Sequence, residues 1–136
     1  MNSKKIGNQK EQELCMLLSN NGYWVYLTPY NEAGQPCDVI ALRKDKNILL
    51  DVKNCKTNSF TFNRLEPNQE TCFEWAKKCG VRLVGLAIYF EKEGCFKWLG
   101  YLQLKLFIEG GMKQVKSSQL LPLEEVLKRY DYTSCE

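Results

Sequence analysis

The chain has 136 residues, of which 44% are hydrophobic and 26% are charged, and its formal net charge is +3. This length and composition are typical of one globular domain with a single hydrophobic core, and they exclude a largely disordered chain. We therefore expect a single domain over residues 1–136. Because neither an export signal nor an apolar segment of membrane-spanning length is visible, we expect a cytoplasmic location and no membrane partner.

The cysteines and the missing histidines restrict the possible chemistry. Seven cysteines are scattered along the chain, none of them spaced as CxxC, and there is no histidine. This pattern favours free thiols over a disulfide framework or a structural zinc site. Without an imidazole, any catalysis must rely on carboxylates, lysines, tyrosines, thiols or a metal.

The first half of the chain predicts a helix followed by three strands. Leu14, Leu17 and Leu18 lie at i, i+3 and i+4 on one face of a helix that begins near Gly7, and Asn20-Asn21-Gly22 ends it. Apolar and β-branched runs predict strands over residues 23–28, 37–43 and 48–54, with a loop over residues 29–36. The short turn between the last two strands indicates an antiparallel hairpin.

The second half predicts a helix, two strands and a terminal helix. Glu66-Pro67-Asn68 is a typical helix start, and Gly80 is the expected C-terminal cap. The remaining elements are expected over residues 81–90, 95–102 and 122–130. The complete order predicts an α/β fold, an α+β sandwich in which helices flank a mixed sheet.

Three charged residues in the predicted hairpin are the candidates for chemistry. Asp51 and Lys53 are two residues apart and share a sheet face, and the hairpin brings Asp38 to the same edge. Two adjacent carboxylates repel each other unless a cation lies between them, and oxygen ligands suit Mg²⁺ or Mn²⁺. Alternatively, Asp51 and Lys53 form a solvated strand end and Asp38 caps a turn.

This arrangement resembles the PD-(D/E)xK nuclease superfamily, which has a restriction-endonuclease-like core. In that superfamily a proline precedes an Asp, and a (D/E)-x-K motif follows on the next strand. The matching positions are Asp38 and Asp51-Val52-Lys53, behind an amphipathic helix. Two departures are that Pro36 stands two residues before Asp38 instead of one, and that Asp replaces the more frequent Glu at position 51.

The N-terminal segment narrows the resemblance. Residues 5–14, KIGNQKEQEL, are similar to the basic-Gly-xxx-Glu-x-Glu-Leu opening of archaeal-type Holliday junction resolvases. This similarity implies that Glu11 completes the acidic cluster, with Glu13 as the competing position. A weaker similarity to RecU-type and phage-encoded resolvases implies that Gln69 belongs to the active site, although a Gln in a helical first turn is usually only solvated.

The resemblance implies a Mg²⁺-dependent, structure-selective DNA endonuclease, in which Mn²⁺ can substitute. A Holliday junction resolvase that cuts four-way junctions in DNA recombination and repair is the favoured function. Asp38, Asp51 and Glu11 would hold the metal, and Lys53 would position the water that attacks the phosphate. The alternatives are a restriction or DNA-end-processing nuclease of the same superfamily, or a DNA-binding module without catalysis.

The same reading implies a homodimer and a set of DNA contacts. A junction has two equivalent strands to cut, so two active sites related by a twofold axis are expected, with interface candidates in residues 96–108. Phe60 and Phe62 alternate with polar residues and indicate a further strand or a DNA-contacting loop, with core packing as the favoured role for the rings. The basic residues expected to contact phosphates are Lys4, Lys5, Lys10, Lys56 and Arg64.

Overall fold

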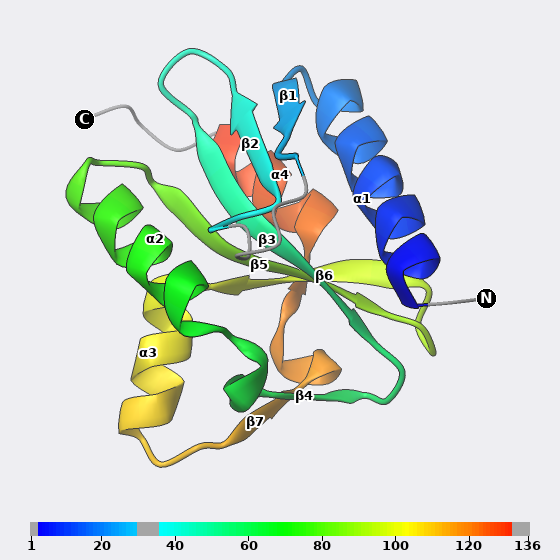
Figure 1. The fold of residues 1–136 in the computed structure, drawn as a ribbon, viewed down its shortest axis with the longest axis vertical. Coiled ribbons are helices and arrows are strands. Elements are labelled where there is room, and N and C mark those ends of the chain that lie inside the picture. The colour runs from blue at the N-terminus through cyan, green and yellow to red at the C-terminus, as the bar shows by residue number, and fades with distance from the viewer. Residues whose placement is uncertain (1–2, 30–35, 132–136) are drawn as a thin grey trace.

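The structure, a computed structural model, describes residues 3–29 and 36–131, with side chains from residue 9 onward, and forms a sheet with helices on both faces (Figure 1). Most of the loop expected over residues 29–36 therefore lies outside the described residues. In chain order the helices and strands are α1 (Ser3–Asn20), β1 (Trp24–Leu27), β2 (Val39–Leu42), β3 (Ile48–Cys55), β4 (Ser59–Thr61), α2 (Pro67–Lys78), β5 (Leu83–Phe90), β6 (Cys95–Gly100), α3 (Tyr101–Glu109), β7 (Gln114–Lys116), β8 (Leu121–Pro122) and α4 (Leu123–Asp131), with short 3-10 turns η1 (Phe62–Arg64) and η2 (Ser117–Gln119).

The main sheet is mixed, as the sequence predicts. Its six strands run in the order β1-β2-β3-β5-β6-β8, with β3 and β5 parallel and every other neighbouring pair antiparallel. The expected hairpin is formed by β2 and β3, in which Val39 lies opposite Leu50. A separate two-stranded sheet is formed by β4 and β7.

Two hydrophobic clusters cover the two faces of the main sheet. One cluster contains Leu14 and Leu18 of α1 and Leu127 of α4, and the other contains Phe73 of α2 and Leu104 of α3. Figure 1 shows α1 on one side of the sheet and α2 and α3 on the other. In the described part of the chain, no helix is long and apolar enough to cross a membrane.

The residues between Cys95 and Glu109 differ from the prediction. The strand expected over residues 95–102 ends at Gly100, and α3 follows immediately. Tyr101 and Leu104 are buried at helical spacing, so tertiary packing on the sheet selects a helix where local alternation indicates a strand. The expected terminal helix is confirmed as α4, and Phe60 and Phe62 are buried in the core, as favoured.

Candidate active site

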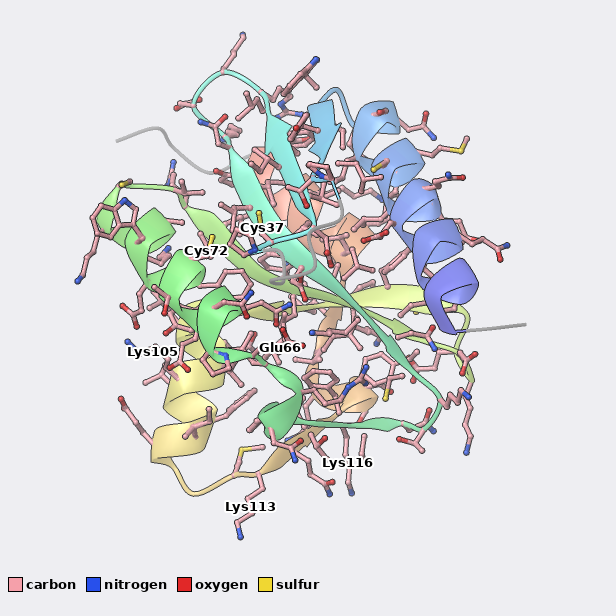
Figure 2. The ribbon with its side chains drawn as sticks, in the orientation of Figure 1. Cys37, Glu66, Cys72, Lys105, Lys113 and Lys116 are labelled. Atoms are coloured by element: carbon pink, nitrogen blue, oxygen red, sulfur yellow. The ribbon has the colours of Figure 1, made fainter. Side chains whose placement is uncertain are left out.

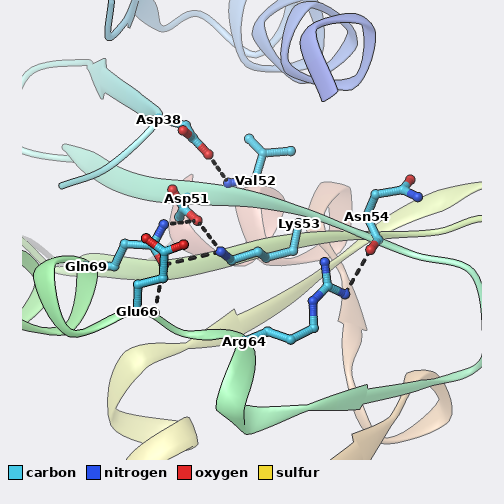
Figure 3. Close-up of polar contacts among 8 residues, drawn as sticks. All are labelled: Asp38, Asp51, Val52, Lys53, Asn54, Arg64, Glu66 and Gln69. Atoms are coloured by element: carbon cyan, nitrogen blue, oxygen red, sulfur yellow. Dashed lines mark hydrogen bonds and ion pairs between the residues drawn. The ribbon is translucent and has the colours of Figure 1, made fainter. Parts of the chain in front are cut away.

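The β2–β3 hairpin brings Asp38 against the strand that carries Asp51 (Figure 3). The backbone N–H of Asp38 donates to the carbonyl of Leu50 at 3.1 Å, and the Asp38 Oδ2 atom accepts a hydrogen bond from the backbone N–H of Val52 at 2.8 Å. On the other side, the backbone N–H of Thr28 donates to the carbonyl of Asp38 at 2.9 Å. Asp38 is therefore fixed between β1 and β3 by main-chain contacts.

Asp51 is the most deeply buried acid of the site, with 1% of its surface exposed. Its Oδ2 atom accepts a hydrogen bond from Gln69 Nε2 at 2.8 Å and lies 3.1 Å from Lys53 Nζ. Its Oδ1 atom is buried and has no hydrogen-bond partner among the described residues. Burial, together with the nearby Asp38 carboxylate, raises the pKa of Asp51 from its ordinary 3.8 to about 8, and the Lys53 ammonium opposes this rise.

Gln69 connects α2 to the charged residues of β3. Its Nε2 group donates to Asp51, and its Oε1 atom accepts from Lys53 Nζ at 3.2 Å and from the backbone N–H of Glu66 at 3.1 Å (Figure 3). Gln69 lies at the third position of α2, where Pro67 begins the helix and Glu66 precedes it. One buried amide therefore satisfies the helix start and orients two charged side chains.

The structure distinguishes between the two glutamates considered for the acidic cluster. Burial and the Asp38 carboxylate raise the pKa of Glu11 to about 7, so Glu11 lies within electrostatic reach of the site. Glu13 is exposed and forms an ion pair with Lys10, at 3.1 Å between Lys10 Nζ and Glu13 Oε2. Of the two glutamates, Glu11 is the one whose carboxyl group interacts with Asp38.

The basic residues expected to contact DNA have different surroundings. Lys10 is held by Glu13 and lies over the ring of Tyr89, 3.8 Å from its centroid. Arg64 is exposed and donates from Nη1 to the carbonyl of Asn54 at 2.9 Å. Lys56 is also exposed, whereas the side chains of Lys4 and Lys5 lie outside the described ones.

Sequence reasoning missed the groups that hold the site from behind. Thr28 Oγ1 donates to the carbonyl of Cys37 at 2.6 Å, and so orients the residue that precedes Asp38. The thiol of Cys37 is buried and interacts with that of Cys72 on α2 (Figure 2), and both thiols lie within electrostatic reach of Asp51. The six cysteines of the described chain are free, as expected. A threonine at a strand end and two cysteines 35 residues apart carry no sequence signal for such contacts.

The donor set fits a divalent cation that takes part of its coordination from water and DNA. Asp51 offers a buried oxygen without a partner, and Asp38 adds a second carboxylate whose repulsion a cation would relieve. Among the described residues, no three Asp, Glu, Cys or His side chains converge closely enough to hold an ion by themselves. Mg²⁺ suits this arrangement, since proteins usually bind it through one or two carboxylates plus waters and substrate phosphates.

The mixed sheet, together with the Asp-(Asp-x-Lys) cluster at its hairpin, defines a nuclease of the PD-(D/E)xK class with a restriction-endonuclease-like fold. A family model described as archaeal Holliday junction resolvase (hjc) matches residues 2–133. The chain therefore belongs to the archaeal Holliday junction resolvase family, and it is a metal-dependent DNA endonuclease that acts on Holliday junctions. The family expected from the sequence is confirmed.

The fold comparison agrees with this family. The solved structure of Hjc from Archaeoglobus fulgidus, a Holliday junction resolvase from an archaeal hyperthermophile, matches with a TM-score of 0.64 and 17% sequence identity. The match covers 90% of this chain and 95% of that one. No curated protein sequence matches the chain. The family match favours a resolvase over the restriction and end-processing alternatives.

The raised pKa of Asp51 predicts how the stability of the metal-free protein depends on pH. The folded state binds the Asp51 proton more tightly than the unfolded state, so the free energy of unfolding should fall as pH rises from about 4 to about 8 and then level off. The slope should approach at most about 1.4 kcal/mol per pH unit for this one proton. Urea unfolding in EDTA at a series of pH values measures it.

Asp51→Asn should reduce this slope by the share of one proton, because asparagine carries no proton that the two states bind differently, while the raised pKa of Glu11 leaves a smaller slope below about pH 7. The matched control is Glu91→Gln at an exposed turn, which removes one carboxylate elsewhere and should keep the wild-type slope. Equal slopes in wild type and Asp51→Asn would contradict the prediction.

Proposed function

We propose that Asp38 and Asp51 hold a catalytic Mg²⁺ ion, that Glu11 contacts it directly or through water, and that Lys53 positions the attacking water. Mn²⁺ is expected to substitute for Mg²⁺. The observation that carries this proposal is the buried, unpartnered Oδ1 atom of Asp51 beside a second carboxylate. When bound, the cation would stabilise the charge that develops on the phosphate and acidify a nearby water.

The role proposed for Lys53 is supported by how its ammonium is held. Lys53 Nζ lies 3.1 Å from Asp51 Oδ2 and 3.2 Å from Gln69 Oε1, and the side chain is only 13% exposed. These two contacts hold the amine at the acidic cluster, and an ammonium has three protons to donate. The remaining proton is available for a hydrogen bond to a water or to a phosphate oxygen of the scissile strand.

We further propose that the enzyme works as a homodimer, because two symmetric cuts in a junction require two active sites. The expected interface range of residues 96–108 is only partly exposed. Phe96 and Trp98 are buried in the core, whereas Leu102, Leu106 and Ile108 are accessible on α3.

Exposed apolar side chains also lie on β1, β2 and α2, namely Trp24, Tyr26, Leu27, Leu42 and Trp75, and they favour an interface there. Tyr26 lies opposite Ile40, and Ile40 lies opposite Leu49, so an apolar row crosses three strands. Leu49 and Trp75 line one apolar pocket of about 420 Å³, and Trp75 is 71% exposed. Trp24 stacks on Tyr26 with ring centroids 6.2 Å apart and is also exposed. Such contiguous apolar surfaces are typical of protein–protein interfaces.

Asp38→Asn and Asp51→Asn should each lower cleavage of a synthetic four-way junction by roughly 100-fold or more, because each removes a proposed ligand of the ion. Junction binding should persist, since phosphate contacts elsewhere supply most of the affinity. Single-turnover cleavage in Mg²⁺ and Mn²⁺, with binding measured in Ca²⁺, tests both statements. Glu124→Gln, an exposed acid at the start of α4, serves as the control. Near-wild-type cleavage by both aspartate variants would refute the assignment.

Gln69→Ala should raise the Mg²⁺ concentration needed for half-maximal cleavage by roughly 10- to 100-fold, because Asp51 and Lys53 lose the amide that orients them. Gln103→Ala is a matched control, since Gln103 Oε1 accepts from the backbone N–H of Gly100 at the start of α3 in the same way. The measurement is a Mg²⁺ titration of cleavage by both variants. The same shift in both would mean that the effect comes from helix capping and not from the site.

Trp75→Glu should convert the proposed dimer into a monomer at micromolar concentration, because it places a charge in the expected apolar interface. Leu106→Glu on the exposed face of α3 is the matched control and should stay dimeric. Sedimentation velocity of the wild type and both variants measures the assembly state. A monomeric wild type would refute the dimer, and a monomer produced only by Leu106→Glu would move the interface to α3.

A further inference from the structure

Two segments of the chain that are far apart in sequence and contain no acidic residue come together at one surface. Residues 52–65 contain three basic residues and residues 110–123 contain two, and neither segment contains an Asp or Glu. They meet where β4 pairs with β7, and we call residues 56–64 and 113–119 the basic ribbon. A net charge of +3 for the whole chain conceals this local excess.

The pairing of β4 with β7 separates an apolar inner face from a polar outer face. Phe60 lies opposite Val115, and both are fully buried in the core. The neighbouring pairs, Ser59 with Lys116 and Thr61 with Gln114, point to the opposite face, and Lys116, Thr61 and Gln114 are exposed. The core therefore fixes the ribbon while its outer face remains open to a partner.

The basic ribbon is joined closely to the active-site strand. Arg64 Nη1 donates to the carbonyl of Asn54, the residue after Lys53. Lys56 follows Lys53 by three positions, which corresponds to about 10 Å along an extended chain. In Figure 2, Lys113 and Lys116 extend from the end of the molecule formed by β4 and β7. A DNA strand cut at the site would thus have neighbouring phosphates within reach of the ribbon.

The ammonium groups of the ribbon are available for such a partner. Among the described residues, no ion pair joins Lys56, Lys113 or Lys116 to a carboxylate. Glu93, which contacts the ribbon through a 2.6 Å hydrogen bond from Ser117 Oγ, also lies 3.7 Å from Lys97 Nζ. Its charge is therefore already compensated.

We infer that the basic ribbon is a second DNA-binding surface, in which Lys113 and Lys116 contact the phosphate backbone of the duplex arm next to the cut. This inference rests on the proposed active site for the position of the cut. Lysines among exposed hydroxyl and amide groups are typical of backbone contacts, which hold DNA without reading its sequence. The ring side chains of β4 and η1 are buried, so this surface lacks the exposed aromatics that bind unpaired bases by stacking.

The test is the salt dependence of DNA binding by the full-length protein. Each lost phosphate contact lowers the slope of log affinity against log salt by about 0.9. Lys113→Gln/Lys116→Gln should therefore lower the slope by about 2, with a four-way junction and with linear duplex alike, because phosphate contacts carry no shape information. Fluorescence anisotropy in Ca²⁺ between low and physiological salt measures it.

The matched control is Lys44→Gln/Lys128→Gln, which removes the same two charges from exposed positions in the β2–β3 turn and on α4. This double variant should keep nearly the wild-type slope. An equal slope in the ribbon variant, the control and the wild type would overturn the inference, and would also be the result if the ribbon served an acidic protein instead of DNA.

A cleavage assay of Asp51→Asn, run alongside the binding measurements, distinguishes failure of this inference from failure of the proposed active site. Loss of cleavage by Asp51→Asn with an unchanged slope in the ribbon variant would overturn only the ribbon. Normal cleavage by Asp51→Asn with a reduced slope in the ribbon variant would overturn only the assignment of the site. Thermal unfolding of the ribbon variant at the wild-type temperature establishes that the fold is intact.

Discussion

The packing of Asp51 beside Asp38 is the constraint on which the rest of the site depends. Two carboxylates in a buried position repel each other and lose their hydration, which is why the pKa of Asp51 rises to about 8. The fold tolerates this because Val52 donates a hydrogen bond to Asp38 Oδ2, while Gln69 and Lys53 both contact Asp51 Oδ2. A divalent cation between the two carboxylates would compensate the negative charge that these contacts leave unneutralised.

The elements around the site act mainly to hold these side chains. The hairpin of β2 and β3 sets the separation of the two aspartates, and β5 supports β3 from the other side over its full length. The start of α2 contributes Gln69, whose amide contacts both Asp51 and Lys53. On the opposite face, α1 brings Glu11 towards Asp38. Each contribution comes from a different element, so the site exists only in the assembled fold.

The two outer surfaces divide the remaining tasks. The apolar row from Tyr26 to Leu49, with the exposed ring of Trp75, suits association with a second copy. The basic ribbon at the other end of the molecule suits the polyanionic substrate. In the proposed dimer, these two surfaces would let one protomer contact its partner and DNA through different residues.

The sequence by itself determined the elements with strong local patterns and the placement of the charged side chains in the hairpin. The leucine spacing of α1, the short turn between β2 and β3, and the Pro-Asn start of α2 depend on neighbouring residues, so each is readable in the chain. The short turn between β2 and β3 also predicts that Asp38 lies close to Asp51 and Lys53 at one edge of the sheet. The resemblance to archaeal-type resolvases rested on the motif of residues 5–14.

Only the tertiary structure decided the contacts between residues distant in sequence. Residues 101–109 form a helix because Tyr101 and Leu104 pack on the sheet. The strand β4 pairs with β7, more than fifty residues away, because both strands bury apolar side chains in one core. The burial of Asp51 and the exposure of Trp75 likewise depend on which elements cover them. Local spacing carries no information on such coverage, because burial is set by the packing of the whole chain.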